Sequence, residues 1–275
     1  MASQPRRLSL EARMRRVYFM CLVPALLVVL LLWEWVGTTC YVWDAIGKDC
    51  SSSPLFTSAP SKVALAALKM FSSGSIWNDM YVSGQEFFLG FLLAILVGIP
   101  FGLLMGWYRR FNYIFDPFIS AGNATPRVAL TPLLIIWLGI GIWSKVALVF
   151  LGASFPIIIN TESGVRALDE TLLRAAHSFG AKDRQIFTTI ALPGSIPFII
   201  SGIRVGLGRG LVGIVVGELL GATAGIGFQM ANAAALFQTD RLWVGVIMIT
   251  AFGVLLTFLL NRLEHRFDAW RPKRT

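Results

Sequence analysis

The chain has 275 residues, of which 56% are hydrophobic and 14% charged. A soluble domain carries roughly 25% charged residues, so this composition excludes an ordinary soluble protein and indicates an integral membrane protein. The formal net charge of +9 would favour nucleic acid as the partner of a soluble chain. In a membrane protein the positions of Lys and Arg set the orientation in the bilayer instead, so we expect contact with membrane lipid and no nucleic-acid partner.

Six apolar stretches approach the roughly 20 residues that cross a bilayer as a helix. In chain order they are Val17–Val36, Phe87–Trp107, Ile114–Ile140, Val146–Ile159, Ile199–Leu220 and Leu242–Leu260. The third contains three prolines and Arg127, and the fourth extends through Asn160 and Thr161. The sequence therefore predicts an all-α membrane protein with six transmembrane helices.

The first of these stretches follows an Arg-rich segment, so a cleaved signal peptide is the alternative to a retained helix. Its apolar run of about 20 residues is longer than a typical signal-peptide core, and such peptides end in a small-residue cleavage site. No A-x-A-like site follows this run. We therefore expect a retained first span.

Lys and Arg are distributed unevenly between the two sides of such a bundle. Sixteen fall in the two tails, the loop before the third span and the loop before the fifth span, whereas five fall in the opposite loops. Because cytoplasmic loops carry the excess of positive charge, both termini are predicted to be cytoplasmic. The expected organisation is a cytoplasmic tail over residues 1–16, a transmembrane domain over 17–261 and a cytoplasmic tail over 262–275.

The long loop after the first span is expected outside the cytoplasm. Within it, apolar residues spaced as in a helix predict an amphipathic helix over Ser61–Phe71, with Ser61 as the candidate N-cap. Cys40 and Cys50 also lie in this loop. On the oxidising side of a membrane they are a candidate disulfide, and two free thiols are the alternative.

Motifs for catalysis are missing from the sequence. It contains two histidines, no Cys–His cluster with metal-ligand spacing, and no G-x-x-x-x-G-K-[ST], G-x-S-x-G or H-E-x-x-H motif. We therefore expect no catalytic residue, no metal site and no cofactor bound by this chain.

Small residues follow one face of the predicted fifth span. Gly202, Gly206, Gly210, Gly213, Gly217 and Gly221 recur at helical spacing, and Gly98, Gly102 and Gly106 repeat the pattern in the second span. Such a stripe lets neighbouring helix backbones approach closely. Tight static packing and sliding of helices during gating are both compatible with it.

Ionisable residues at membrane depth are costly and indicate function. Arg127 and Arg209 are predicted near the middle of the third and fifth spans, and Glu218 towards the outer end of the fifth. A path for an anion needs cationic groups near the membrane midplane, so the candidate path residues are Arg127, Arg209, Glu218 and Asn160. The alternative is that each arginine pairs with a carboxylate or extends to an interface.

The stretch RAAHSFGAKDRQIFTTIALP, residues 174–193, is polar and charged within an otherwise apolar chain. Asp169 and Glu170 suit a helix N-terminus, and residues 172–179 predict about two helical turns. Gly180 stands where a helix ends in the left-handed conformation. Pro193 predicts the end of a second short helix over residues 182–191. An ordinary amphipathic loop is the alternative that these features leave open.

This stretch resembles the E-A-A-x3-G-x9-I-x-L-P loop of binding-protein-dependent ABC importer permeases. The matching positions are Ala175, Ala176, Gly180, Ile190, Leu192 and Pro193. Arg174 stands at the leading Glu and reverses its charge. In that family the loop docks on the ATPase subunit, so the resemblance implies a coupling loop over residues 165–197, which also contains Asp183.

Other stretches are similar to the nitrate/sulfonate/taurine-type permeases of that family. They are SGQEFFLGF (83–91), TPRVALTPLLIIWLGIGIWSK (125–145) and GELLGATAGIG (217–227), with APSKV (59–63) as a looser match. Glu86 stands where many members carry Arg. Glu86 and Arg127 therefore indicate a branch away from the best-known sulfonate members.

The resemblance implies a type I ABC importer permease-like fold in a bacterial inner membrane and a transport subunit rather than an enzyme. It implies ATPase subunits that bind ATP and Mg, an extracytoplasmic solute-binding protein and a second permease copy in a homodimer. The expected solute is small and anionic, of the nitrate, sulfonate, taurine or bicarbonate kind. A secondary transporter of a small organic anion is the alternative function.

Overall fold

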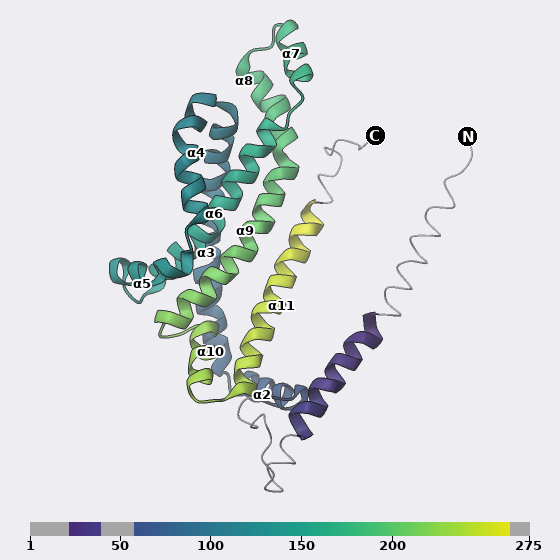
Figure 1. Cartoon of the computed structure of the whole chain (residues 1–275), viewed down its shortest axis with the longest axis vertical. Helices are drawn as coiled ribbons and strands as arrows, with labels where there is room; N and C mark the ends of the chain where they lie inside the picture. Colours follow the sequence, from purple (N-terminus) through teal and green to yellow (C-terminus); the bar gives the residue numbers. More distant parts are fainter. Residues whose placement is uncertain (1–21, 40–57, 265–275) are drawn as a thin grey trace, which may run out of the picture. The chain divides into compact units, whose positions relative to one another are not determined.

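The structure is a computed structural model that describes residues 22–39 and 58–264. Within these residues the regular elements are helices (Figure 1). They are the helix Leu22–Thr39, α2 (Pro60–Ser72), α3 (Ser75–Trp107), α4 (Arg109–Ala124), α5 (Arg127–Leu138), α6 (Ile142–Arg166), α7 (Glu170–Ser178), α8 (Asp183–Ile186), a π-helix (Phe187–Ala191), α9 (Leu192–Gly221), α10 (Ile226–Ala235) and α11 (Thr239–Glu264).

The chain forms two compact units. Among the described residues, the first comprises 22–39, 58–72 and 233–244, and the second comprises 73–232 and 245–264. In the second unit α6 packs along both α3 and α9. Phe87, Val149, Leu207 and Ile214 form one buried cluster between these helices.

The glycine stripe lies where these helices meet. A Cβ atom on Gly102 of α3 would stand 2.6 Å from the carbonyl oxygen of Ile158 in α6. A Cβ on Gly213 of α9 would stand 3.0 Å from the carbonyl oxygen of Leu148, also in α6. The absence of a side chain at both positions therefore allows backbone-to-backbone contact on either side of α6.

The third predicted span, whose sequence is interrupted by prolines, consists of two helices, α4 and α5, with a break at residues 125–126. Thr125 has an extended backbone, with φ −65° and ψ 128°. Pro126 explains the break, because proline disfavours the helical conformation of the preceding residue and has no N–H to donate. Five described helices are long and apolar enough to cross a membrane, and α5 is a shorter apolar helix.

The other predicted spans correspond to single helices whose ends differ from the expected ones. The second span begins twelve residues before Phe87, at Ser75, and the last continues to Glu264, into the range expected to be the C-terminal tail. The fifth belongs to a continuous helical rod over Asp183–Gly221. The N-terminal tail over 1–16, Cys40 and Cys50 lie outside the described residues.

The first unit contains the amphipathic helix that the loop sequence predicts. It begins at Pro60, so Ser61 lies within its first turn and the expected N-cap is wrong. The Ser61 hydroxyl and backbone N–H donate to the Glu34 carboxylate at 2.7 and 3.0 Å. Ser58 Oγ donates to Asp240 at 2.6 Å. These bonds tie α2 and the residues before it to other parts of the same unit.

Candidate functional site

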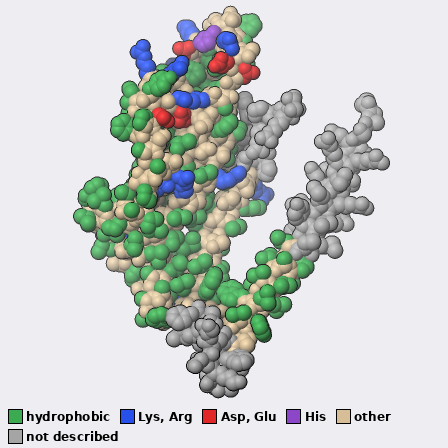
Figure 2. Space-filling model, viewed as in Figure 1, with side chains coloured by type: hydrophobic (Ala, Val, Ile, Leu, Met, Phe, Trp, Pro, Cys, Tyr) green, Lys and Arg blue, Asp and Glu red, His purple; other side chains and the backbone are tan. Residues whose placement is uncertain are grey.

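Charged side chains of the second unit gather at the end that carries α7 and α8, while the visible side chains along the helices below are mainly hydrophobic (Figure 2). This end contains the predicted coupling loop, residues 165–197. A second polar site lies between α4, α5 and α9, where Arg127 and Arg209 meet. The two sites are described in turn.

The first helix of the coupling loop is α7, which begins after Asp169 as its sequence predicts. The backbone N–H of Thr171 donates to Oδ1 of Asp169 at 2.7 Å. That bond, together with a hydrogen bond from the Thr171 side chain, holds the pKa of Asp169 below its ordinary value. The cap therefore stabilises α7 above the ordinary aspartate pKa and is lost as the pH falls through the lowered one.

Gly180 has φ +79°, the left-handed conformation that the sequence predicts for this position. The backbone N–H of Ala181 donates to the carbonyl oxygen of Ala176 at 3.1 Å, and that of Gly180 donates to His177 at 2.9 Å. These bonds satisfy carbonyl groups at the end of α7. A Cβ on Gly180 would meet nothing within 4 Å, so its backbone conformation alone calls for glycine.

Pro193 does not end the second helix, contrary to the sequence analysis. It lies in the first turn of α9, and α8, the π-helix and α9 run on as one rod. A proline is tolerated where no helical N–H bond is required. The π-helix just before Pro193 accommodates the proline. Its wider turn is closed by the Leu192 N–H, which donates to the Phe187 carbonyl oxygen, so no bond from residue 193 is needed there.

A groove of about 430 Å³ lies between α7 and the start of the rod. It is lined by Ala176, Phe179, Gly180, Ala181, Gln185, Ile186, Thr189 and Ile190. Phe179 is 92% exposed, whereas Ile186 is 1% exposed and anchors α8. Phe179 and Ile186 were not singled out by the sequence analysis, because the family motif leaves their positions open.

The remaining residues of the predicted coupling loop lie around this groove. Arg174 and Glu170 form an exposed ion pair at 3.4 Å along α7. Asp183 Oδ1 lies 3.9 Å from Nε2 of His177. Leu192 and Pro193 belong to the first turn of α9, and Ala175 is exposed on α7. Exposed ion pairs add little stability, so Arg174 is available to a partner.

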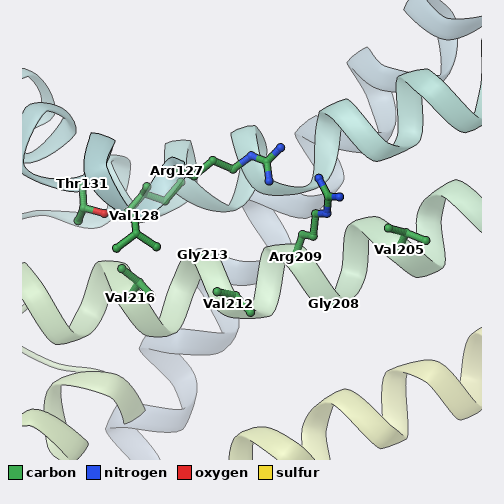
Figure 3. A pocket seen from close by; sticks show the side chains of 10 residues that line it. Arg127, Val128, Thr131, Val205, Gly208, Arg209, Val212, Gly213 and Val216 are labelled. Carbon is green, nitrogen blue, oxygen red and sulfur yellow. The ribbon is translucent and has the colours of Figure 1, made fainter. Parts of the chain in front are cut away.

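Arg127 and Arg209 lie far apart in sequence but come together in the structure. Arg127 begins α5, directly after the break, and Arg209 lies within α9. Figure 3 shows their side chains extending towards the same place. Oδ1 of Asn123 accepts from Arg209 Nη1 at 2.7 Å and from Arg127 Nη2 at 3.2 Å. One neutral oxygen therefore holds two guanidinium groups.

The two arginines line a cavity of about 380 Å³ between α5, α6 and α9. The rest of its lining is mostly valine, glycine and leucine, with Thr131 as a further polar residue. Arg127 also stands over the ring of Phe155, 5.6 Å from its centroid. Nε of Arg127 and Oγ1 of Thr131 are buried without a hydrogen-bond partner among the described residues. The cavity thus combines two positive charges with unused polar atoms.

The other two candidate path residues lie elsewhere. Asn160 donates to the carbonyl oxygen of Pro156 within α6 at 2.8 Å, and its Cβ would lie 2.9 Å from a Cβ on Gly202 of α9. Glu218 is buried near the C-terminal end of α9 and accepts from Ser83. Arg204, the other arginine of α9, donates to Asn261 at 2.6 Å and does not line the cavity of Arg127 and Arg209. A role for Asn160 and Glu218 in a path stays a prediction.

The sequence analysis missed Asn123, Thr131 and Phe155, which complete the arginine site. Asn123 stands four residues before Arg127, one helical turn away, and its polarity within a predicted span was the available signal. Phe155 carried no signal, because a phenylalanine in an apolar span is expected in any case.

These features describe an α-helical integral membrane protein, and comparisons with known proteins give its family. Residues 98–270 match the family described as "Binding-protein-dependent transport system inner membrane component". The taurine transport system permease protein TauC of Escherichia coli (strain K12) is 33% identical over 234 residues, covering 83% of this chain and 85% of that protein. The putative aliphatic sulfonates transport permease protein SsuC of Bacillus subtilis (strain 168) is 33% identical over 230 residues, covering 84% and 83%.

Solved structures share the fold at low sequence identity. The MetNI methionine ABC transporter, in inward facing conformations, matches with a TM-score of 0.61 and 15% identity, covering 72% of this chain and 96% of that one. An amino acid ABC transporter matches with a TM-score of 0.56 and 17% identity, covering 74% and 97%. The expected type I ABC importer permease fold is therefore confirmed.

The chain belongs to the binding-protein-dependent transport system inner membrane component family. It is a permease component of an ABC importer, a multi-pass inner-membrane transport subunit and not an enzyme. The alternative of a secondary transporter receives no support from these matches.

Proposed function

We propose that the chain forms the translocation path for a small anion of the taurine or sulfonate kind. The observation that carries this proposal is the arginine site, where two guanidinium groups share the single neutral oxygen of Asn123 beside a cavity. Planar guanidinium groups match the oxygens of sulfonate and carboxylate groups, and neither arginine is neutralised by a carboxylate within this site. The relatives named for taurine and aliphatic sulfonates support the same class of solute.

The groove beside Gly180 is the proposed docking site for an ATPase subunit. Support comes from its exposed Phe179 and from the match of the coupling loop to the family motif. In this proposal ATP and Mg bind to the ATPase subunits, and this chain binds no cofactor of its own. Arg174 would face a more acidic groove on the ATPase than a leading Glu would.

A second copy of the permease completes the proposed transporter, with the arginine sites of the two copies around one path. An extracytoplasmic binding protein delivers the solute. Both termini and the coupling loop lie in the cytoplasm, since the excess of Lys and Arg falls on that side. Switching between inward- and outward-facing states follows from movement of the ATPase subunits against the coupling loops.

Purification of the tagged full chain from its native membrane tests this proposal. We expect ATPase subunits to co-purify, and the complex in proteoliposomes to import taurine or an alkanesulfonate only with ATP and the binding protein present. Nitrate and bicarbonate serve as comparison solutes. Import driven by an ion gradient without ATP, or import of neutral solutes with no preference for sulfonates, would contradict it.

A further inference from the structure

A cluster of buried charged groups lies near the C-terminal end of α9, at the opposite end of the rod from α8. Glu86 of α3, Lys145 of α6 and Glu218 of α9 are 2%, 2% and 1% exposed. The three residues come from three helices and are separated by 59 to 132 positions in sequence. Neither the arginine site nor the coupling loop includes them, so the proposed function leaves them unexplained.

Glu218 accepts two short hydrogen bonds from its surroundings. Its Oε1 accepts from Ser83 Oγ at 2.5 Å and its Oε2 accepts from the backbone N–H of Gly227 at 2.6 Å. Ser83 Oγ accepts in turn from the N–H of Ile226 at 2.8 Å. A Cβ on Gly225 would stand 2.5 Å from a carboxylate oxygen of Glu218, so the turn wraps closely around this group. Short donated bonds of this kind favour an ionised acceptor.

Lys145 supplies a positive charge to the cluster. Its ammonium group donates to the carbonyl oxygens of Ile140 and Gly141, the latter at 3.1 Å, and interacts electrostatically with both Glu86 and Glu218. One positive charge balances one carboxylate. A second ionised carboxylate in the same buried place would be uncompensated, which is expensive in an apolar interior.

Glu86 is that second carboxyl group. It lies one helical turn after Ser83, which bonds to Glu218, and its Oε2 is buried without a hydrogen-bond partner among the described residues. Two carboxyl groups can share a hydrogen bond only if one of them carries a proton, because an ionised carboxylate has no donor. The burial of both carboxyl groups and the charge balance thus both favour one bound proton.

The surroundings provide little further compensation. The turn at Gly225 is also met by Asp79 of α3, which accepts from its N–H at 2.9 Å and adds a negative charge. From α11 the neighbouring cavity beside Glu218 is lined by Met248, Ile249 and Phe252. The titratable groups facing the pair are therefore Lys145, which can neutralise one carboxylate, and Asp79, which can neutralise none.

We propose that Glu86 and Glu218 form a proton-binding site, in which Glu86 holds the proton at neutral pH and donates it to the Glu218 carboxylate. The bound proton leaves Lys145 and Glu218 as a balanced pair and keeps α3 joined to α9 and to the turn at residues 225–227. Loss of the proton as the pH rises leaves two carboxylates facing each other and releases this connection. The site does not depend on which solute the permease carries.

Infrared spectroscopy of the full-length chain in lipid nanodiscs tests the site directly. We expect a protonated-carboxyl band at neutral pH that disappears in Glu86→Gln. Because glutamine resembles the protonated acid, Glu86→Gln should keep the wild-type unfolding temperature at neutral pH. The wild type should lose stability at alkaline pH, and Glu86→Gln should not. Glu218→Gln should lower the unfolding temperature, because a single amide oxygen then replaces the two carboxylate oxygens that accept from Ser83 and Gly227.

Two results would overturn the proposal. They are a wild-type spectrum without the band or with a band unchanged in Glu86→Gln, and equal destabilisation by the two glutamine variants. Repeating the spectrum with sodium and with potassium as the sole cation separates a proton site from a sodium site. A band that disappears on addition of sodium at constant pH would assign the site to sodium instead.

Discussion

At the scale of single residues, Asn123 determines how the two arginines are presented. Its Oδ1 accepts from both guanidinium groups, yet it brings no charge of its own. A carboxylate in that place would neutralise one arginine and form strong charge-assisted bonds. The neutral amide therefore orients both groups while leaving their charge for a ligand. This arrangement suits binding that must also be reversible.

Replacing either arginine by glutamine tests the anion site. Arg127→Gln and Arg209→Gln keep a hydrogen-bond donor and remove a charge, and hydrogen bonds to charged groups contribute about 1.5–3 kcal/mol. We therefore expect the apparent KM for a sulfonate to rise roughly tenfold or more, since 1.4 kcal/mol corresponds to about tenfold. ATP-dependent uptake into proteoliposomes is the measurement.

Arg204→Gln is the matched control for these variants. Arg204 lies on the same helix as Arg209 but bonds to Asn261 and does not line the cavity of the two arginines. Its removal should leave the apparent KM within about twofold of the wild type. Equal uptake by the wild type and by both cavity variants would show that the two arginines are structural.

Asn123→Asp provides the complementary test. The new carboxylate would sit between the two guanidinium groups and neutralise part of their charge. We expect assembly of the transporter to be retained and anion uptake to fall, with the loss relieved in part by high solute concentration. An unchanged apparent KM in this variant would mean that the site does not bind the solute.

At the scale of elements, apolar length and proline position account for most of what could be predicted from the sequence. The apolar runs located α3, α6, α9 and α11, and Gly180 located the end of α7. Pro126 and Pro193 behave differently, although both were visible. Pro126 breaks a helix, whereas the π-helix before Pro193 carries the chain through. That difference depends on backbone bonding around each proline, which composition does not show.

Gly180→Val tests the coupling loop by its backbone conformation. Because a Cβ at Gly180 meets no neighbour, the substitution strains only the left-handed turn, at a cost of about 1–2 kcal/mol for a non-glycine residue and more for a β-branched one. We expect stimulation of the ATPase by solute and binding protein to be lost, while the chain still inserts into the membrane.

Gly180→Asn is the control, because asparagine enters the left-handed conformation more readily. It should retain much of the stimulated ATPase activity, which is measured as phosphate release from the reconstituted complex. Full transport by the valine variant would contradict a coupling role for this turn.

The glycine contacts of α6 can be tested in the same way. Gly102→Ala places a methyl group 2.6 Å from the carbonyl oxygen of Ile158, whereas Gly84→Ala on the same helix meets nothing within 4 Å. Overpacking typically costs about 1–3 kcal/mol, while alanine in an open helical position gains about 0.5–1 kcal/mol over glycine. Thermal unfolding in detergent should show a midpoint below that of the wild type for Gly102→Ala but not for Gly84→Ala. If the midpoint of Gly102→Ala is no lower than that of Gly84→Ala, α3 and α6 can separate easily.

At the scale of the whole molecule, the sequence predicts the membrane class and the family motif but not which distant residues meet. Glu86, Lys145 and Glu218 come from three helices, and no local pattern joins them. The same holds for Arg127 and Arg209, whose depth was predictable while their shared partner was not. Helix packing decides such contacts, and it depends on glycine contacts spread over α3, α6 and α9.

The orientation of the chain is a prediction for the whole molecule that its own cysteines can test. If both termini are cytoplasmic, Cys40 and Cys50 face the oxidising side and the coupling loop faces the cytoplasm. We predict that Cys40 and Cys50 form a disulfide, so in a Cys21→Ala background a membrane-impermeant maleimide added to intact cells should label them only after reduction. Ser178→Cys, in α7, should be labelled only after the cells are permeabilised. Labelling of Cys40 and Cys50 without a reductant would show two free thiols, and labelling of the Ser178→Cys position in intact cells would reverse the predicted orientation.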